Sequence, residues 1–139
     1  KFPELLPQAF VHFGNFIGAT LRIADELHIP EVTMGIMIGK AVKLAEGFLD
    51  THSKKVVMNK AFLKQLAIKS GCSQEALALI ENLTLARELW EHLSEADACL
   101  FFTELLDNCY AHCRPLMSDG KLTILLIDEE GHIFNWKER

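Results

Sequence analysis

Two glycine-containing segments have the residue types of ligand-binding loops. In the first, Gly14-Asn15-Phe16-Ile17-Gly18, Gly14 permits a tight turn, Asn15 can cap a helix and Gly18 leaves room for a ligand. In the second, Gly39 and Lys40 begin a helical pattern. Because helix N-termini bind anions, both segments are candidate ligand walls. Close packing of Gly18 against another backbone is the alternative interpretation of the first.

The second segment, Gly35 to Lys40, is similar to a phosphate-binding loop but is one spacer residue short. Ala41 also occupies the place of the magnesium-binding Ser or Thr, which argues against nucleoside triphosphate hydrolysis. A Lys in the first turn of a helix is disfavoured by the helix dipole unless an anion is near. Lys40 and Lys43 therefore predict an anionic ligand, or else they are solvated side chains at a small cost.

Two further groups of polar residues could carry chemistry. Thr51-His52-Ser53 places an imidazole between two hydroxyls, but no Ser-His-Asp triad can be assembled, and a helix C-cap is the alternative. Cys109 and Cys113 are one helical turn apart, with Cys99 further back on nearly the same face. Four metal ligands are not evident, so the pattern predicts thiols packed in a core and no metal site.

Composition narrows the class of protein. The chain has 139 residues, 50% of them hydrophobic, and a net charge of −5, which excludes disorder and sequence-independent nucleic-acid binding. The longest apolar runs, about five residues, cannot span a membrane. The segment from Lys40 to Lys69 contains seven Lys and only two acidic residues, Glu46 and Asp50, so its local charge is positive. Four Cys indicate a reduced, cytoplasmic compartment, and the missing initial Met suggests that the chain is excised from a longer one.

The elements that position these residues can be read from hydrophobic periodicity. Strands are expected at Phe10–Phe13 and Val32–Ile38, joined by a helix over Asn15–His28, which makes a right-handed parallel unit. The second strand has no charged residue, which predicts that both of its faces are covered. A helix over Lys40–Leu49 follows.

The rest of the chain is predicted to be mainly helical, ending in a hairpin. Asn59 can cap a helix over Lys60–Ser70 that Gly71 ends, and Ser73 can cap a helix over Gln74–Ile80. Ser94 to Asp97 resembles a capping box that opens a helix over Glu95–His112. An apolar strand over Lys121–Ile127 then turns into Ile133–Trp136. The expected fold class is α/β: a single domain over residues 1–139 with a short, mostly parallel sheet of about four strands flanked by helices, and a C-terminal hairpin.

The order of three motifs resembles one known family. Gly14-Asn15-Phe16-Ile17-Gly18, the segment Ile38–Gly47 and Thr51-His52-Ser53 are similar to the patterns G/S-N-F-I-G, G-H-x-G-K-L-x-K-L-A-x-G and T-H-S in the carboxy-terminal half of the cobalt-precorrin-5B (C-1) methyltransferase family, CbiD. One departure is Met37, which stands where the family has His, so no role for that His is carried over.

The resemblance implies a function in anaerobic cobalamin biosynthesis, with S-adenosylmethionine donating a methyl group to C-1 of a cobalt-bearing, polycarboxylate tetrapyrrole. Members carry an amino-terminal domain that this chain lacks, so the chain alone is expected to be inactive. The walls of the ligand site are expected to be Gly14, Asn15 and Gly18; Gly39, Lys40 and Lys43; and Thr51, His52 and Ser53. The alternative is a non-catalytic tetrapyrrole- or nucleotide-binding module that docks in a multidomain protein.

Overall fold

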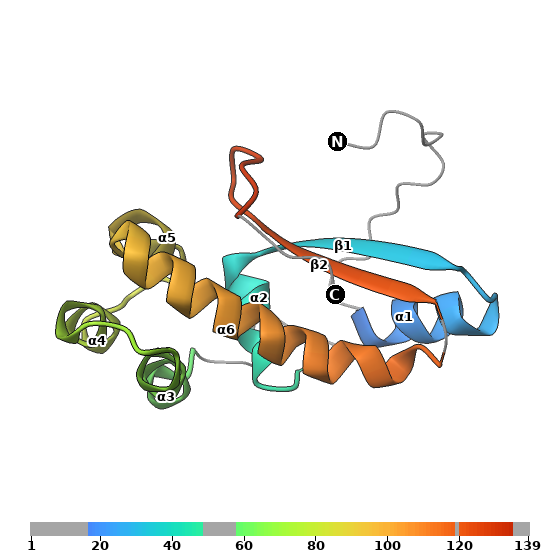
Figure 1. Cartoon of the computed structure of the whole chain (residues 1–139), viewed down its shortest axis with the longest axis horizontal. Coiled ribbons are helices and arrows are strands. Elements are labelled where there is room, and N and C mark those ends of the chain that lie inside the picture. The colour runs from blue at the N-terminus through green and yellow to red at the C-terminus, as the bar shows by residue number, and fades with distance from the viewer. Residues whose placement is uncertain (1–16, 49–57, 119, 135–139) are drawn as a thin grey trace.

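The fold places helices on one side of a small parallel sheet (Figure 1). The computed structural model of the chain describes residues 17–48, 58–118 and 120–134. Its elements are α1 (Ile17–Glu26), β1 (Glu31–Met37), α2 (Ile38–Ala45), α3 (Lys60–Ser70), α4 (Gln74–Glu81), α5 (Arg87–His92), α6 (Glu95–Cys113), the 3-10 helix η2 (Arg114–Leu116) and β2 (Lys121–Ile127).

The sheet is smaller than the sequence predicted. β1 and β2 pair in parallel, in register from Glu31 with Lys121 to Met37 with Ile127. The α/β class is confirmed, but about four strands is wrong for the described ranges, which hold a sheet of two. After the turn, Ile133 makes one antiparallel bridge to Ile127, so the described residues contain the start of the expected hairpin. Phe10–Phe13 and Trp136 lie outside the described residues.

The two strands are covered differently. Met34 and Ile36 of β1 are buried, whereas Thr33, Gly35 and Met37 are exposed, so the prediction that both faces of this strand are covered is wrong. The run lacks charge because small and apolar residues also occupy its open face. β2 instead has the pattern expected of a doubly covered strand, since every residue from Leu122 to Leu126 is buried.

Most helix boundaries follow the predicted caps. The Oδ1 atom of Asn59 and the Oγ atoms of Ser73 and Ser94 each accept a backbone hydrogen bond from the first turn of the helix they precede, and Gly71 ends α3 at φ +83°. α1 lies inside the predicted range. α5 was missed, because six residues without a side-chain cap are too few to show a helical period.

The core is organised around α6. Phe101, Phe102 and Leu105 are fully buried, and the Sγ–H of Cys109 donates a hydrogen bond to the Ala41 carbonyl oxygen of α2 at 3.2 Å. Cys109 and Cys113 are both buried, which confirms that these two thiols pack in the core, whereas Cys99 is exposed, contrary to its placement on the same face. α6 therefore packs directly against α2.

A tertiary cap joins α4 to α6. The sequence predicted a capping box at Ser94 and Asp97, and the Ser94 half is present. The Asp97 carboxylate bonds elsewhere: it accepts from the Ser73 amide at 2.9 Å and from the Ser73 hydroxyl at 2.5 Å. These hydrogen bonds, the one from the hydroxyl above all, lower the pKa of Asp97. One carboxylate thus stabilises the start of α4 from the first turn of α6.

The Asp97→Asn variant is expected to be less stable at pH 7, because the ionised carboxylate is the better acceptor. A lowered folded pKa means that the carboxylate stabilises the fold above its unfolded pKa, about 3.9, and that this contribution is lost as pH falls through the folded pKa. The difference between wild type and variant should therefore shrink from pH 5 downward in urea titrations. A gap that stays constant with pH would contradict the assignment. Glu95→Gln, an exposed residue on the same first turn, is the control.

Candidate functional site

The first turn of α2 lies at the carboxyl end of β1. Met37 ends the strand and is also the N-cap of α2, with extended backbone (φ −85°, ψ 160°) and no side-chain hydrogen bond to the helix. The first N–H groups of a helix have no intrahelical acceptor, so they present partial positive charge at this end. The residues that carry them, Ile38 to Lys40, include no acidic side chain.

Gly39 makes this turn accessible. It is exposed, and a Cβ atom added to it would meet no other atom within 4 Å. Lys40 follows as the third helical residue and is half-buried, while Ala41 and Val42 are buried and hold the helix on the core. The predicted strand end at Ile38 and helix start at Lys40 are both too late, since β1 ends at Met37 and α2 already begins at Ile38. The arrangement can accept an anion such as a carboxylate.

Lys43 has a different setting from Lys40. It is half-buried in the last turn of α2, where the helix dipole favours a cation. The sequence argument placed both Lys near the N-terminal turn, and that placement is wrong for Lys43 because the helix has only eight residues. Gly18 is buried in α1. Gly14, Asn15, Thr51, His52 and Ser53 lie outside the described residues.

Within the positive segment between Lys40 and Lys69, the lysines of α3 have partners on other helices. On α3, Lys64 pairs with Glu81, the Lys60 ammonium donates to the Glu81 carbonyl oxygen at 3.1 Å, and Lys69 pairs with Glu104 at 3.0 Å. The hydrogen bond from Lys64 lowers the pKa of Glu81. Lys64 and Lys69 thus pair with acidic side chains of α4 and α6. This agrees with the alternative that the lysines of α3 form an ordinary solvated helix face.

The end of β2 is acidic and occupied by its own turn. Because Met37 pairs with Ile127, the residues that follow them, Ile38 and Asp128, leave the sheet at the same end, the carboxyl end of both strands. The Asp128 carboxylate accepts from the Glu130 and His132 amides at 2.9 and 2.8 Å, and lies 3.0 Å from His132 Nδ1. An anion at this end of the sheet is therefore expected to bind the start of α2 and not the acidic turn that follows β2.

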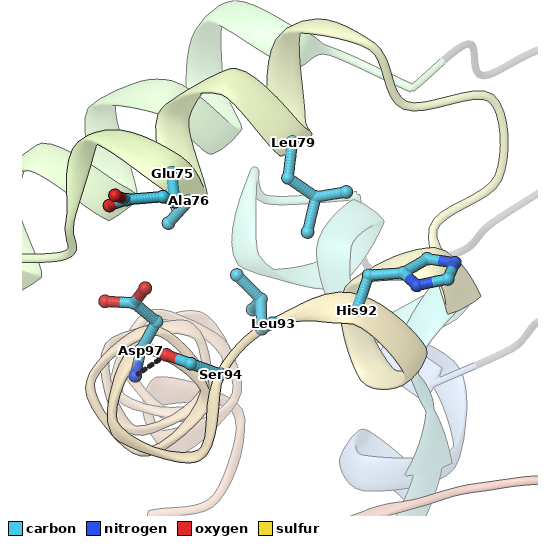
Figure 2. Close-up of a pocket in the computed structure, with 7 residues that line it drawn as sticks. All are labelled: Glu75, Ala76, Leu79, His92, Leu93, Ser94 and Asp97. Carbon is cyan, nitrogen blue, oxygen red and sulfur yellow. Dashed lines mark hydrogen bonds between the residues drawn. The ribbon is translucent and has the colours of Figure 1, made fainter.

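A cavity of about 210 Å³ lies elsewhere, between α4, α5 and the start of α6. Figure 2 shows the carboxylates of Glu75 and Asp97 on one side and the His92 ring on the other. Leu79 and Leu93 form much of the lining. Both Asp97 oxygens already bond to Ser73, so this carboxylate serves the start of α4, and we do not place the site there.

The buried thiols are not suited to chemistry. Burial raises the pKa of Cys109 well above its usual range and that of Cys113 to about 12, so both stay protonated at neutral pH. The described ranges contain no group of three or more His, Cys, Asp or Glu side chains able to hold a metal ion. In the same ranges, no helix is both long and apolar enough to cross a membrane.

Comparison with known proteins identifies relatives across most of the chain. The family model described as "CbiD, C-terminal domain" matches residues 50–138. The Cobalt-precorrin-5B C(1)-methyltransferase of Geobacillus kaustophilus is 35% identical over 126 residues, covering 89% of this chain and 33% of the relative. Proteins of the same name from Prosthecochloris aestuarii (32% identical, 91% and 34% covered) and Thermus thermophilus (31%, 99% and 38%) match similarly. No solved structure matches.

The chain spans about a third of the length of these curated relatives. Two of the three motifs that suggested the family lie before residue 50, whereas the family model matches residues 50–138 and includes the third, Thr51-His52-Ser53. The part of the chain before the matched range therefore points to the same family. The alignments with relatives cover both parts. The chain belongs to the CbiD family and corresponds to its C-terminal domain.

Proposed function

We propose that the full-length protein is an S-adenosylmethionine-dependent methyltransferase that methylates C-1 of cobalt-precorrin-5B in anaerobic cobalamin biosynthesis. The names of its relatives support the methyl transfer and the precorrin substrate. S-adenosylmethionine would supply an electrophilic methyl group: the sulfur–methyl bond breaks as the bond to C-1 forms. Such a transfer requires alignment and exclusion of water more than acid–base groups, which agrees with a site built from a helix end.

This chain would supply one wall of the substrate site. The observation that carries this assignment is the start of α2, with its uncapped N-terminus, the open space at Gly39 and Lys40 in the first turn. Precorrins bear several acetate and propionate carboxylates, and N–H groups with a nearby ammonium are suitable partners for them. S-adenosylmethionine also has a carboxylate, but its ammonium and sulfonium do not suit this turn, so we assign the turn to the tetrapyrrole.

The remaining predicted walls stay part of the proposal: Gly14, Asn15 and Gly18, Lys43, and Thr51 to Ser53. We also propose that residues 1–139 form one domain, supported by a single core cluster that includes residues from α1 through β2. A cytoplasmic location is supported by the free cysteines of the described residues.

Lys40→Ala in the full-length protein is expected to weaken tetrapyrrole binding by about 5- to 150-fold, corresponding to roughly 1–3 kcal/mol for a charge-assisted hydrogen bond. The loss should shrink at high salt, which screens the wild-type attraction. The measurement is calorimetric titration at low and high ionic strength. Lys43→Ala should have a smaller effect, since Lys43 lies in the last turn.

Lys69→Ala is the matched control, because it removes the same charge from another helix, α3, next to Glu104 of α6. If Lys40→Ala and Lys69→Ala bind the tetrapyrrole equally well, the assignment of α2 to the substrate is wrong. Binding of the tetrapyrrole without any methyl transfer by the full-length protein would instead favour the docking module.

A further inference from the structure

Among the described residues β1 pairs only with β2, so its other edge has no strand beside it there. On its inner edge, the Pro30 carbonyl oxygen accepts a hydrogen bond from the Lys121 amide at 2.8 Å, which begins the ladder to β2. In a parallel pair, alternate residues direct both backbone groups toward the same neighbour. The backbone groups that turn outward are therefore those of the odd-numbered residues, Glu31, Thr33, Gly35 and Met37. Within the described ranges, no strand pairs with them.

Beyond its first residue, this edge lacks the features that normally keep edge strands from pairing. Such strands usually carry charged residues, proline or a bulge. β1 has one charge, Glu31 at its start directly after Pro30, whereas Val32 to Met37 contains no charge and no proline, and its register with β2 runs without interruption. The outward residues are exposed, and the side chain of Met37 is 41% exposed. A strand that is uncharged from Val32 onward, has no bulge and carries an exposed apolar side chain is suited to accept another strand.

We propose that the outer edge of β1 pairs with an extended, apolar strand from the amino-terminal part of the full-length protein. The curated relatives are about three times as long as this chain, and the matching family model is that of a C-terminal domain, so a large preceding segment is available in the same polypeptide. Covalent linkage gives such a strand a high effective concentration.

The pairing would also bring the preceding part of the protein to the candidate site. β1 continues directly into α2, since the strand ends at Met37 and the helix begins at Ile38. A strand along β1 therefore ends next to the uncapped turn that carries Gly39 and Lys40, and the substrate would bind between two parts of one enzyme. This inference rests on the proposed function only in treating the chain as part of that longer enzyme.

Residue-resolved hydrogen exchange on the full-length protein tests the pairing. The amides of Thr33, Gly35 and Met37 are expected to exchange at least about 100-fold more slowly than unstructured amides, as the inward amides of Met34 and Ile36 should. Exchange of the three outward amides within about tenfold of the unstructured rate would overturn the proposal. Protection that appears only at high protein concentration would indicate a second copy and would also overturn it.

Two variants identify the occupant of the edge. Thr33→Pro removes an outward N–H, and is expected to speed exchange at Gly35 and Met37 while Met34 stays protected; Thr33→Val keeps the N–H and should behave as wild type. A photoreactive benzoylphenylalanine in place of Met37 should crosslink to residues that precede this chain. Crosslinks to this chain itself, including the strand predicted at Phe10–Phe13, or between two copies, would contradict the proposal.

Methyl transfer measured on the same samples separates this inference from the proposed function. Fast exchange along the edge in a full-length enzyme that turns over overturns the pairing and leaves the function standing. A protected edge crosslinked to the preceding segment, in a protein without turnover, supports the pairing and contradicts the function.

Discussion

Replacing Phe102 by alanine is expected to lower the free energy of unfolding of this chain by about 3–5 kcal/mol, the usual cost of removing a buried phenylalanine. Phe102 is fully buried in α6, and its ring centroid lies 4.9 Å from that of Trp90, 5.4 Å from Phe134 and 5.8 Å from Phe101. All three contacts are edge-on, an arrangement that adds to the energy of burial. The variant therefore loses packing to α5 and to the segment after β2 at once.

Urea denaturation followed by circular dichroism measures this loss. Leu100→Ala is the control on the same helix, since Leu100 is 43% exposed and its removal should change stability by about 0.5 kcal/mol or less. Similar losses for the two variants would contradict the placement of α6 at the centre of the core.

Gly120→Ala is expected to cost about 2–4 kcal/mol, since it combines a left-handed backbone with a steric clash. Gly120 has φ +84°, and an added Cβ would lie 2.9 Å from the Ile29 carbonyl oxygen and 3.1 Å from that of Pro30. The Pro30 oxygen also accepts the first hydrogen bond between the strands, from Lys121. Relieving the clash would thus displace the start of β2 from β1.

Gly131→Ala separates the two causes. Gly131 has nearly the same φ, +87°, but an added Cβ would meet nothing within 4 Å. Its loss should be about 1–2 kcal/mol, the cost of the backbone conformation alone. Equal losses at Gly120 and Gly131, measured by urea denaturation, would show that the approach of Gly120 to the Ile29–Pro30 backbone is not tight.

The parts of the fold that depend on neighbouring residues could be predicted from sequence. Asn59, Ser73 and Ser94 cap helices because their side chains bond three residues ahead, which is visible as spacing. The number of strands and the coverage of each face depend on which distant segments meet. An uncharged run is compatible with a strand covered on both faces, as β2 is, and with a strand that has one exposed face, as β1 has.

The candidate site could also be predicted only in part from the sequence. Gly39 and Lys40 were recognisable because a strand pattern gives way to a helix pattern there, but the start of the helix was misplaced, which put Lys43 in the wrong turn. The partner of Asp97 is 24 residues away, and the acidic partners of the α3 lysines are also distant in sequence. Such pairs follow only from the packing of the helices.

Transfer of a labelled methyl group from S-adenosylmethionine to cobalt-precorrin-5B by the full-length protein tests the central claim most directly. The account predicts a product labelled at C-1 together with S-adenosylhomocysteine, and no product from residues 1–139 alone, because the site is shared with the preceding part of the protein. Absence of labelled product with the full-length protein, or a label on another carbon, would contradict the proposed activity. Turnover by residues 1–139 alone would contradict the shared site.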